Sequence, residues 1–311
     1  MKKNLFFGGI VCIIILVVIG VRLSERQSQV SQKSVATEQI SVVTSFYPLF
    51  FFAKEIAQEM ALVYNITPSG SEPHEYEPTP QDRASIEKSD LLILNGDGLE
   101  AWGDSITRNI DPNRTSIIVA GEGLATGTFV EEGKTIVDPH VWLSPVLAEQ
   151  MVDKITQGFV QADPSNEIVY RSNAEVLKSK LVDLDNMYMQ SLSTCKEKNI
   201  VTSHSAFGYL AQAYGLTQVP IAGLSPDAEP SAKEIGDIVT FAKENDVKYI
   251  FFESLISPKL AQTIAKEVGA QTLVLNPIEG LTDEEVVSGE NYFSVMQNNL
   301  INLKTALRCN E

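Results

Sequence analysis

Histidine, cysteine and positive charge are all scarce in this chain of 311 residues, which has three histidines and three cysteines. Lysine and arginine number 24 against 40 aspartates and glutamates, so the formal net charge is −16. Nucleic acids are bound by clustered basic side chains, and this balance therefore argues against a nucleic-acid partner. The few thiols argue against a copper(I) site, which favours sulfur ligands. With 44% hydrophobic and 21% charged residues, the composition is that of a globular protein of about two domains.

The three histidines are placed alike, each in a polar segment beside proline or serine. His74 and His140 each follow a proline, and His204 lies between two serines. Imidazole is the commonest side-chain ligand of transition metals, because it coordinates in its neutral form and titrates near physiological pH. We therefore interpret the three histidines as one ligand set, with zinc as the first candidate. The alternative is that scarce histidines fall in loops by chance.

The N-terminus carries a targeting segment, since Lys2 and Lys3 precede an uncharged apolar run over residues 5–21. Such a run is an export signal or a membrane-spanning helix, and the lysines place the rest of the chain outside the cytoplasm. We predict an uncleaved anchor over residues 1–21 and a flexible tether over residues 22–39. Cleavage near Gly20 and lipidation at Cys12 are the alternatives.

Two cysteines, Cys195 and Cys309, lie outside the apolar segment, in a compartment that permits disulfides. We predict that they pair and so join the start of the C-terminal half to its last helix. The alternative is two separate thiols. In the chain-entropy model, closing a loop of this size stabilises the fold by about 4–5 kcal/mol.

Strands and helices alternate along the chain, with short apolar runs separated by helical segments. Predicted strands lie at 40–44, 62–67, 91–95 and 116–120, and again at 199–203, 217–221, 249–252 and 271–275. This alternation predicts parallel sheets covered on both faces. Residues 163–195 have no glycine and no proline after Pro164, and their apolar residues recur at helical spacing. We therefore predict two α/β lobes, 40–162 and 196–311, joined by a single long rigid helix, with a metal cleft between the lobes.

The candidate ligands fall where open α/β sheets bind their ligands, at the carboxyl ends of strands. Predicted strands end at or before His74, His204, Glu253 and Glu279, whereas His140 precedes a helix of the first half. Two histidines thus belong to one predicted lobe, and one histidine with a carboxylate belongs to the other. We predict that they bind one metal ion between the lobes.

Three imidazoles and one carboxylate form a four-ligand set of the kind that zinc prefers, whereas manganese tolerates more carboxylates. We predict Glu279 as the fourth ligand. Glu253, Asn276 and a water molecule are the competitors. Glu253 is also a candidate for supporting a ligand by a hydrogen bond from outside, or for capping a helix.

Seven segments together resemble the solute-binding receptors of ABC importers for zinc and manganese, the cluster A-I (cluster 9) family. They are Ser45-Phe-Tyr-Pro48, Glu72-Pro-His-Glu-Tyr-Glu-Pro78, Leu94-Asn-Gly-Asp-Gly-Leu-Glu100, Asp138-Pro-His-Val-Trp-Leu-Ser-Pro145, Thr202-Ser-His-Ser-Ala-Phe-Gly-Tyr-Leu210, Glu229-Pro-Ser231 and Leu275-Asn-Pro-Ile-Glu-Gly-Leu-Thr282. The resemblance extends from residue 40 to residue 309. The set is highly specific, although no single segment is.

The resemblance implies two α/β lobes joined by a long helix, metal bound between them, and delivery to a membrane permease driven by a separate ATPase. By position, His74, His140 and His204 match the family's first three ligands. Manganese members tend to carry Glu at the position of His204, so the resemblance favours zinc over manganese. Many members carry Asp where this chain has Asn276, and some zinc members use a Glu three positions later, which matches Glu279. Many zinc members also have a histidine-rich loop before the second ligand, but residues 121–137 contain no histidine.

The leading hypothesis is a monomeric extracytoplasmic receptor, not an enzyme, that captures Zn²⁺ and delivers it to an ABC permease. A zinc hydrolase is the first alternative: water would replace Glu279 as a ligand, and Glu253 would act as the base. A surface adhesin is the second alternative, because some relatives are of that kind. No residue pattern in the sequence specifies a protein partner.

Overall fold

A computed structural model of the chain describes residues 39–131, 133–226 and 228–310. Contacts divide the chain into two units, Met1–Gln39 and Ile40–Glu311, and every element below belongs to the second. The predicted anchor, and the predicted tether except for its last residue, lie outside the described residues. Within the part of the chain that is described, no helix is both long enough and apolar enough to cross a membrane.

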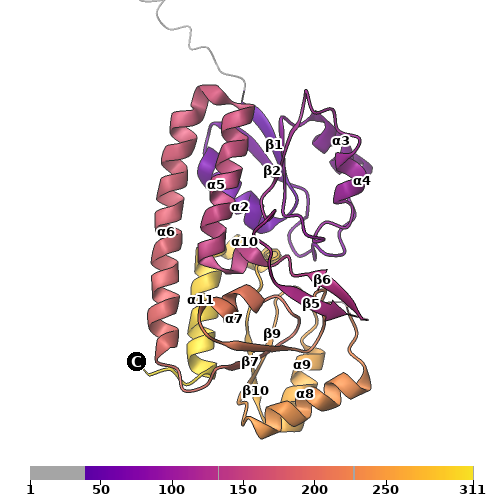
Figure 1. Cartoon of the computed structure of the whole chain (residues 1–311), viewed down its shortest axis with the longest axis vertical. Coiled ribbons are helices and arrows are strands. Elements are labelled where there is room, and N and C mark those ends of the chain that lie inside the picture. Colours follow the sequence, from indigo (N-terminus) through magenta and orange to yellow (C-terminus); the bar gives the residue numbers. More distant parts are fainter. Residues whose placement is uncertain (1–38, 132, 227, 311) are drawn as a thin grey trace, which may run out of the picture. The chain divides into compact units, whose positions relative to one another are not determined.

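Two four-stranded sheets, each wholly parallel, form the framework of the second unit (Figure 1). In spatial order, the first sheet contains β2 (Ala61–Asn65), β1 (Ile40–Thr44), β3 (Leu91–Leu94) and β4 (Ser116–Val119). The second contains β10 (Gln271–Val274), β9 (Tyr249–Phe252), β7 (Asn199–Thr202) and β8 (Thr217–Pro220). If the strands of each sheet are numbered along the chain, both sheets have the order 2-1-3-4. The two sheets therefore share one topology.

The strand sequences are apolar because helices cover both faces of each sheet. In β3, Leu91 and Ile93 pack into one hydrophobic cluster, with α2 (Tyr47–Ala57) and α5 (Pro145–Ala162). Leu92 and Leu94 point to the opposite face and pack with α3 (Pro80–Lys88) and α4 (Gly103–Thr107). The second sheet is covered in the same way: α8 (Ala232–Glu244) and α9 (Lys259–Val268) lie on one face, and α7 (Gly208–Ala213) with α11 (Tyr292–Ala306) on the other.

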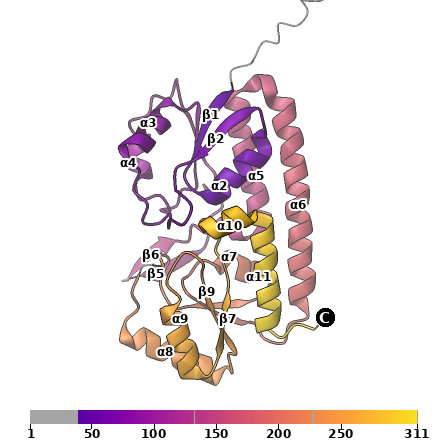
Figure 2. The ribbon, with the colours of Figure 1, turned by 180° about the vertical axis from the view of Figure 1, so that it is seen from behind.

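One long helix, α6 (Glu167–Ser193), runs beside α5 and α11 (Figures 1 and 2). Its 27 residues span about 40 Å. It buries a single face, through Tyr170, Ala174, Leu177, Leu181, Leu184, Tyr188 and Leu192. The predicted fold class of two parallel-sheet α/β lobes with a long helix is confirmed. The lobe boundaries stay predictions, because one hydrophobic core extends through both sheets.

The structure departs from the predicted elements in three places. The predicted long helix begins as a short 3₁₀ turn, Pro164–Asn166, before α6 starts. The segment 121–137 contains an antiparallel hairpin of β5 (Thr128–Glu131) and β6 (Lys134–Val137), which gives no strand pattern because β6 is exposed on both faces. A short helix, α10 (Asp283–Ser288), has too few residues for a helical repeat, although Thr282 and Glu285 form a capping box at its start.

Cys195 and Cys309 form a disulfide, as predicted. Cys195 lies just after α6, and Cys309 lies just after α11. The bond therefore joins the ends of two helices that already pack together, and it closes a sequence separation of 114 residues.

Replacing both cysteines, as Cys195→Ser with Cys309→Ser, is expected to lower the free energy of unfolding by about 2–5 kcal/mol, because the unfolded chain gains freedom. Urea denaturation followed by circular dichroism measures this loss. The wild-type protein in reductant is the control and should lose a similar amount, whereas the double variant should not respond to reductant. Equal stability of the variant and the wild type would contradict a stabilising role for the bond.

Candidate metal centre

Three of the predicted ligands lie in loops that follow the carboxyl ends of strands. His74 is in the loop after β2, His204 follows β7, and Glu279 lies in the loop after β10. His204 also stands next to the position where the strand order of its sheet reverses, between β7 and β9. Open parallel sheets bind their ligands at such positions.

His140 does not follow a strand of either four-stranded sheet; it lies directly before a 3₁₀ turn, Val141–Leu143. Hydrogen bonds to the two residues before it hold its segment beside the other three side chains. Asn95, the residue directly after β3, donates from Nδ2 to the carbonyl of Pro139 at 3.0 Å. From the other side, the hydroxyl of Tyr209 in α7 donates to the carbonyl of Asp138 at 2.8 Å. Residues near both sheets thus hold the segment that carries His140.

The four side chains converge on a single point. Nε2 of His140 lies 3.3 Å from Nε2 of His74 and 3.3 Å from Nε2 of His204. Oε1 of Glu279 lies 3.1 Å from Nε2 of His140, 3.2 Å from that of His204 and 3.4 Å from that of His74. A tetrahedral zinc ion at its usual ligand distances would hold its ligands about 3.3 Å apart. These five distances match an ion of that size, and all four atoms lie within 4.8 Å of one another.

Two carboxylates fix the orientation of the rings from outside this group. Nδ1 of His140 lies 2.7 Å from Oδ1 of Asp138, and Nδ1 of His204 lies 2.7 Å from Oε1 of Glu253. A carboxylate only accepts hydrogen bonds, so each ring donates from Nδ1 and its neutral form turns the Nε2 lone pair inward. Glu253, a competitor for the fourth ligand, is therefore bonded to Nδ1 of His204, on the side of the ring that faces away from the other three side chains.

The electrostatics of the group favour added positive charge. Burial lowers the pKa of His204, but the carboxylates of Glu253 and Glu279 outweigh it and raise the pKa well above its ordinary value. The pKa of His140 is raised in the same way, against burial, by Asp138 and Glu279. Burial raises the pKa of Glu279, but the facing histidines, His204 first, hold it well below its usual range. For His74, burial dominates and lowers the pKa.

Asn276, the other competitor, does not join the group. Its Oδ1 accepts a hydrogen bond from the backbone N–H of Ile278 at 2.7 Å. The structure thus brings together His74, His140, His204 and Glu279 and leaves Glu253 and Asn276 in supporting positions.

Two more hydrogen bonds hold the segment that carries Glu279, and no pattern in the sequence predicts them. Nε1 of Trp142 donates to the carbonyl of Pro277 at 2.7 Å, which ties the His140 segment to the Glu279 segment. The backbone N–H of Gly70 donates to the carbonyl of Leu281 at 2.8 Å, which ties the loop of His74 to the same segment. Only the position of Trp142 close to His140 hints at such a role.

Comparison with known proteins gives concordant results. The family model described as "Zinc-uptake complex component A periplasmic" (ZnuA) matches residues 42–306. The "High-affinity zinc uptake system protein ZnuA" of Bacillus subtilis is 42% identical over 281 residues, which cover 87% of this chain and 88% of that protein. The "Zinc-binding lipoprotein AdcA" of Streptococcus pneumoniae is 40% identical, and the match covers 88% of this chain but only 57% of AdcA. The crystal structure of the Zn(II)-bound ZnuA-like domain of that AdcA superposes with a TM-score of 0.76 at 40% identity, covering 87% of this chain and 99% of that chain.

In the Glu253→Gln variant we expect the pKa of His204 to be lower than in the wild type, because one of the two carboxylates that raise this pKa against burial is lost. NMR of the imidazole protons in chelator-treated protein measures the pKa, and three histidines keep the spectrum simple. Asp138→Asn is the matched control, which should lower the pKa of His140 and leave that of His204 nearly unchanged. If His204 titrated alike in Glu253→Gln and in the wild type, the assigned role of Glu253 would be wrong.

Proposed function

Because this chain belongs to the zinc-uptake complex component A (ZnuA) family, we propose that it captures Zn²⁺ outside the cytoplasm and delivers it to the permease of an ABC importer. Members of this family are solute-binding receptors and not enzymes. The observation that carries the proposal is the convergence of three imidazole nitrogens and one carboxylate oxygen at the spacing of a tetrahedral ion.

The proposed ligands are His74, His140, His204 and Glu279. This set of nitrogen and oxygen donors suits zinc, whereas manganese favours more oxygen ligands and a higher coordination number. Zn²⁺ with three neutral imidazoles and one carboxylate carries a charge of +1. The carboxylates hydrogen-bonded to His140 and His204 offset that charge and strengthen the two imidazoles as ligands.

His74 is the proposed gate for capture and release. Its side chain is 10% exposed, whereas those of His140 and His204 are fully buried. The backbone N–H of Gly70, in the loop of His74, donates to the carbonyl of Leu281, in the segment of Glu279. Release to the permease then requires this loop to part from that segment, which removes a ligand and admits water.

The alternatives receive less support. In a hydrolase, Glu253 would have to act as a base at the ion, but its carboxylate is bonded to the far side of the His204 ring. Four protein ligands also close the coordination position that hydrolysis needs. The adhesin stays a hypothesis, since no feature of the described residues specifies a protein partner.

The proposed location is the outer face of the cytoplasmic membrane, with residues 1–21 as the anchor and the receptor acting as a monomer. The apolar run after Lys2 and Lys3 supports the anchor. The net charge of −16 argues against nucleic acid as a partner.

The Glu279→Ala variant is expected to bind zinc about 100-fold more weakly than the wild type or worse, since loss of a mere supporting residue already costs about 10–100-fold. Competition titration against a chelating dye near neutral pH measures both affinities. Glu77→Ala is the control, because Glu77 is an exposed carboxylate in the same loop as His74. Unchanged affinity in Glu279→Ala would remove this residue from the site and restore the open coordination position of a hydrolase.

The zinc affinity is expected to fall as the pH is lowered, because protons and Zn²⁺ compete for the same Nε2 atoms. The pKa values of His140 and His204 are raised above 6.5, so the loss should begin above that pH and continue below it. Each proton displaced by zinc changes the affinity by about tenfold per pH unit. Competition titrations over a pH series measure the slope, and an affinity that did not depend on pH would contradict histidine ligation.

A further inference from the structure

The segment that carries Glu279 is a tight turn with an unusual backbone. Ile278, the residue before Glu279, has φ of 58°, in the left-handed region that β-branched residues rarely adopt. Ile278 is also fully buried, so its conformation is held by packing and by hydrogen bonds. Strained residues of this kind persist only where the surrounding structure fixes them. The direction of the Glu279 side chain therefore depends on what fixes Ile278.

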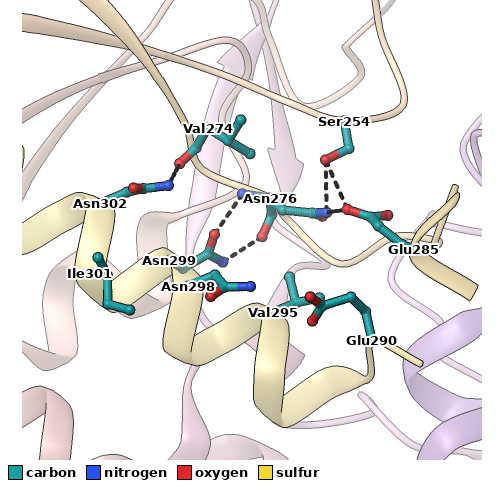
Figure 3. Close-up of a pocket in the computed structure, with 10 residues that line it drawn as sticks. All are labelled: Ser254, Val274, Asn276, Glu285, Glu290, Val295, Asn298, Asn299, Ile301 and Asn302. Carbon is teal, nitrogen blue, oxygen red and sulfur yellow. Dashed lines mark hydrogen bonds between the residues drawn. The ribbon is translucent and has the colours of Figure 1, made fainter. Parts of the chain in front are cut away.

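Asn276 fixes the turn from within, and every polar atom of its side chain is bonded. Its Oδ1 accepts from the N–H of Ile278 at 2.7 Å. Its Nδ2 donates to Oγ of Ser254 at 3.1 Å and to Oε1 of Glu285 at 3.2 Å (Figure 3). The amide oxygen is thereby directed to the backbone of the turn and not to the metal centre.

Asn299 in α11 holds the backbone of Asn276 through two hydrogen bonds. Its Nδ2 donates to the carbonyl of Asn276 at 2.7 Å, and its Oδ1 accepts from the N–H of Asn276 at 2.8 Å (Figure 3). This pair of bonds imitates the pairing of a neighbouring strand, just beyond the end of β10. Both Asn276 and Asn299 are buried, so neither pair of bonds competes freely with water.

Glu285 connects this arrangement to α10. Its Oε2 accepts from the N–H of Thr282 and so caps the helix, while its Oε1 accepts from Asn276. One carboxylate thus joins the start of α10 to the turn that carries Glu279.

We propose that Asn276, Asn299 and Glu285 are positioning residues that aim Glu279 at the ion and limit the site to four ligands. This inference deepens the proposed function and rests on it. If the turn relaxed, Ile278 would leave its left-handed conformation and Glu279 would swing away from the three imidazoles. Because Oδ1 of Asn276 accepts from Ile278, Asn276 does not supply a fifth ligand to the ion, which suits zinc and disfavours cations that prefer six ligands.

The surroundings offer a matched control. A cavity of about 330 Å³ lies beside the turn, and Asn276, Asn299 and Asn302 all line it (Figure 3). Asn302 lies next to Asn299 on the same face of α11, but its Nδ2 donates to the carbonyl of Val274 at 2.8 Å, in β10 and before the turn. Replacing Asn302 by Ala removes a similar hydrogen bond beside the same cavity, while the hydrogen bonds of Asn276 and Asn299 that hold the turn remain.

The test compares Asn276→Ala, Asn276→Ser, Glu285→Ala and Asn302→Ala with the wild type. Zinc affinity is measured by competition titration, and thermal unfolding is recorded for each variant without metal. Co²⁺ serves as a spectroscopic probe, because four-coordinate Co²⁺ has intense visible bands that weaken when water raises the coordination number. Glu285 is only half-buried, so Glu285→Ala is the second variant should Asn276→Ala fail to fold.

We expect Asn276→Ala and Glu285→Ala to bind zinc about 10–100-fold more weakly, with weaker Co²⁺ bands, and Asn302→Ala to bind within about twofold of the wild type. Asn276→Ser should regain part of the affinity, since its hydroxyl can accept from Ile278. Wild-type affinity in both Asn276→Ala and Glu285→Ala would overturn the positioning role alone. So would an equal loss in Asn302→Ala, because the loss would then follow stability. A wild-type chain that bound no zinc would overturn the proposed function as well.

Discussion

The metal centre is governed by the mutual repulsion of electron-rich atoms that face one another where they are buried. Three imidazole nitrogens and a carboxylate oxygen lie within 4.8 Å of one another, and three of the four side chains are fully buried. Charge interacts strongly where water is excluded, so such a group is stable only with positive charge at its centre. Hydrogen bonds from His140 to Asp138 and from His204 to Glu253 keep both rings turned inward. The centre is therefore built in advance for a cation, and protons compete with the metal for it.

The fold supplies the convergence by bringing together loops that are far apart in the sequence. Two sheets of the same strand order carry three of the four proposed ligands, His74, His204 and Glu279, in loops beyond the carboxyl ends of their strands, where open parallel sheets bind their ligands. The long helix α6 packs against helices of both halves, which limits how far the two sheets can move apart. The bond from Trp142 to Pro277 then sets the His140 segment against the Glu279 segment.

Much of this could be predicted from residues whose patterns are local. Runs such as Leu91–Leu94 identify buried strands, and histidines beside proline and serine identify the ligand loops, to which the family resemblance adds the matching positions. Other features depend on tertiary contacts and have no local pattern. Whether Glu253 binds the ion or supports His204 depends on a contact across 49 residues, and the role of Asn299 depends on helix α11 lying beside the end of β10. The hairpin β5–β6 has no clear pattern in the sequence because all four residues of β6 are exposed and both strands are short.

Zinc K-edge X-ray absorption spectroscopy of the zinc-loaded protein in solution tests the central claim most directly. It reports the number, type and distance of the atoms around the ion without reference to the fold. We expect four ligands at about 2.0–2.1 Å, with the multiple-scattering signature of three imidazoles and one further oxygen. A sulfur ligand, a six-coordinate ion or fewer than three imidazoles would contradict it.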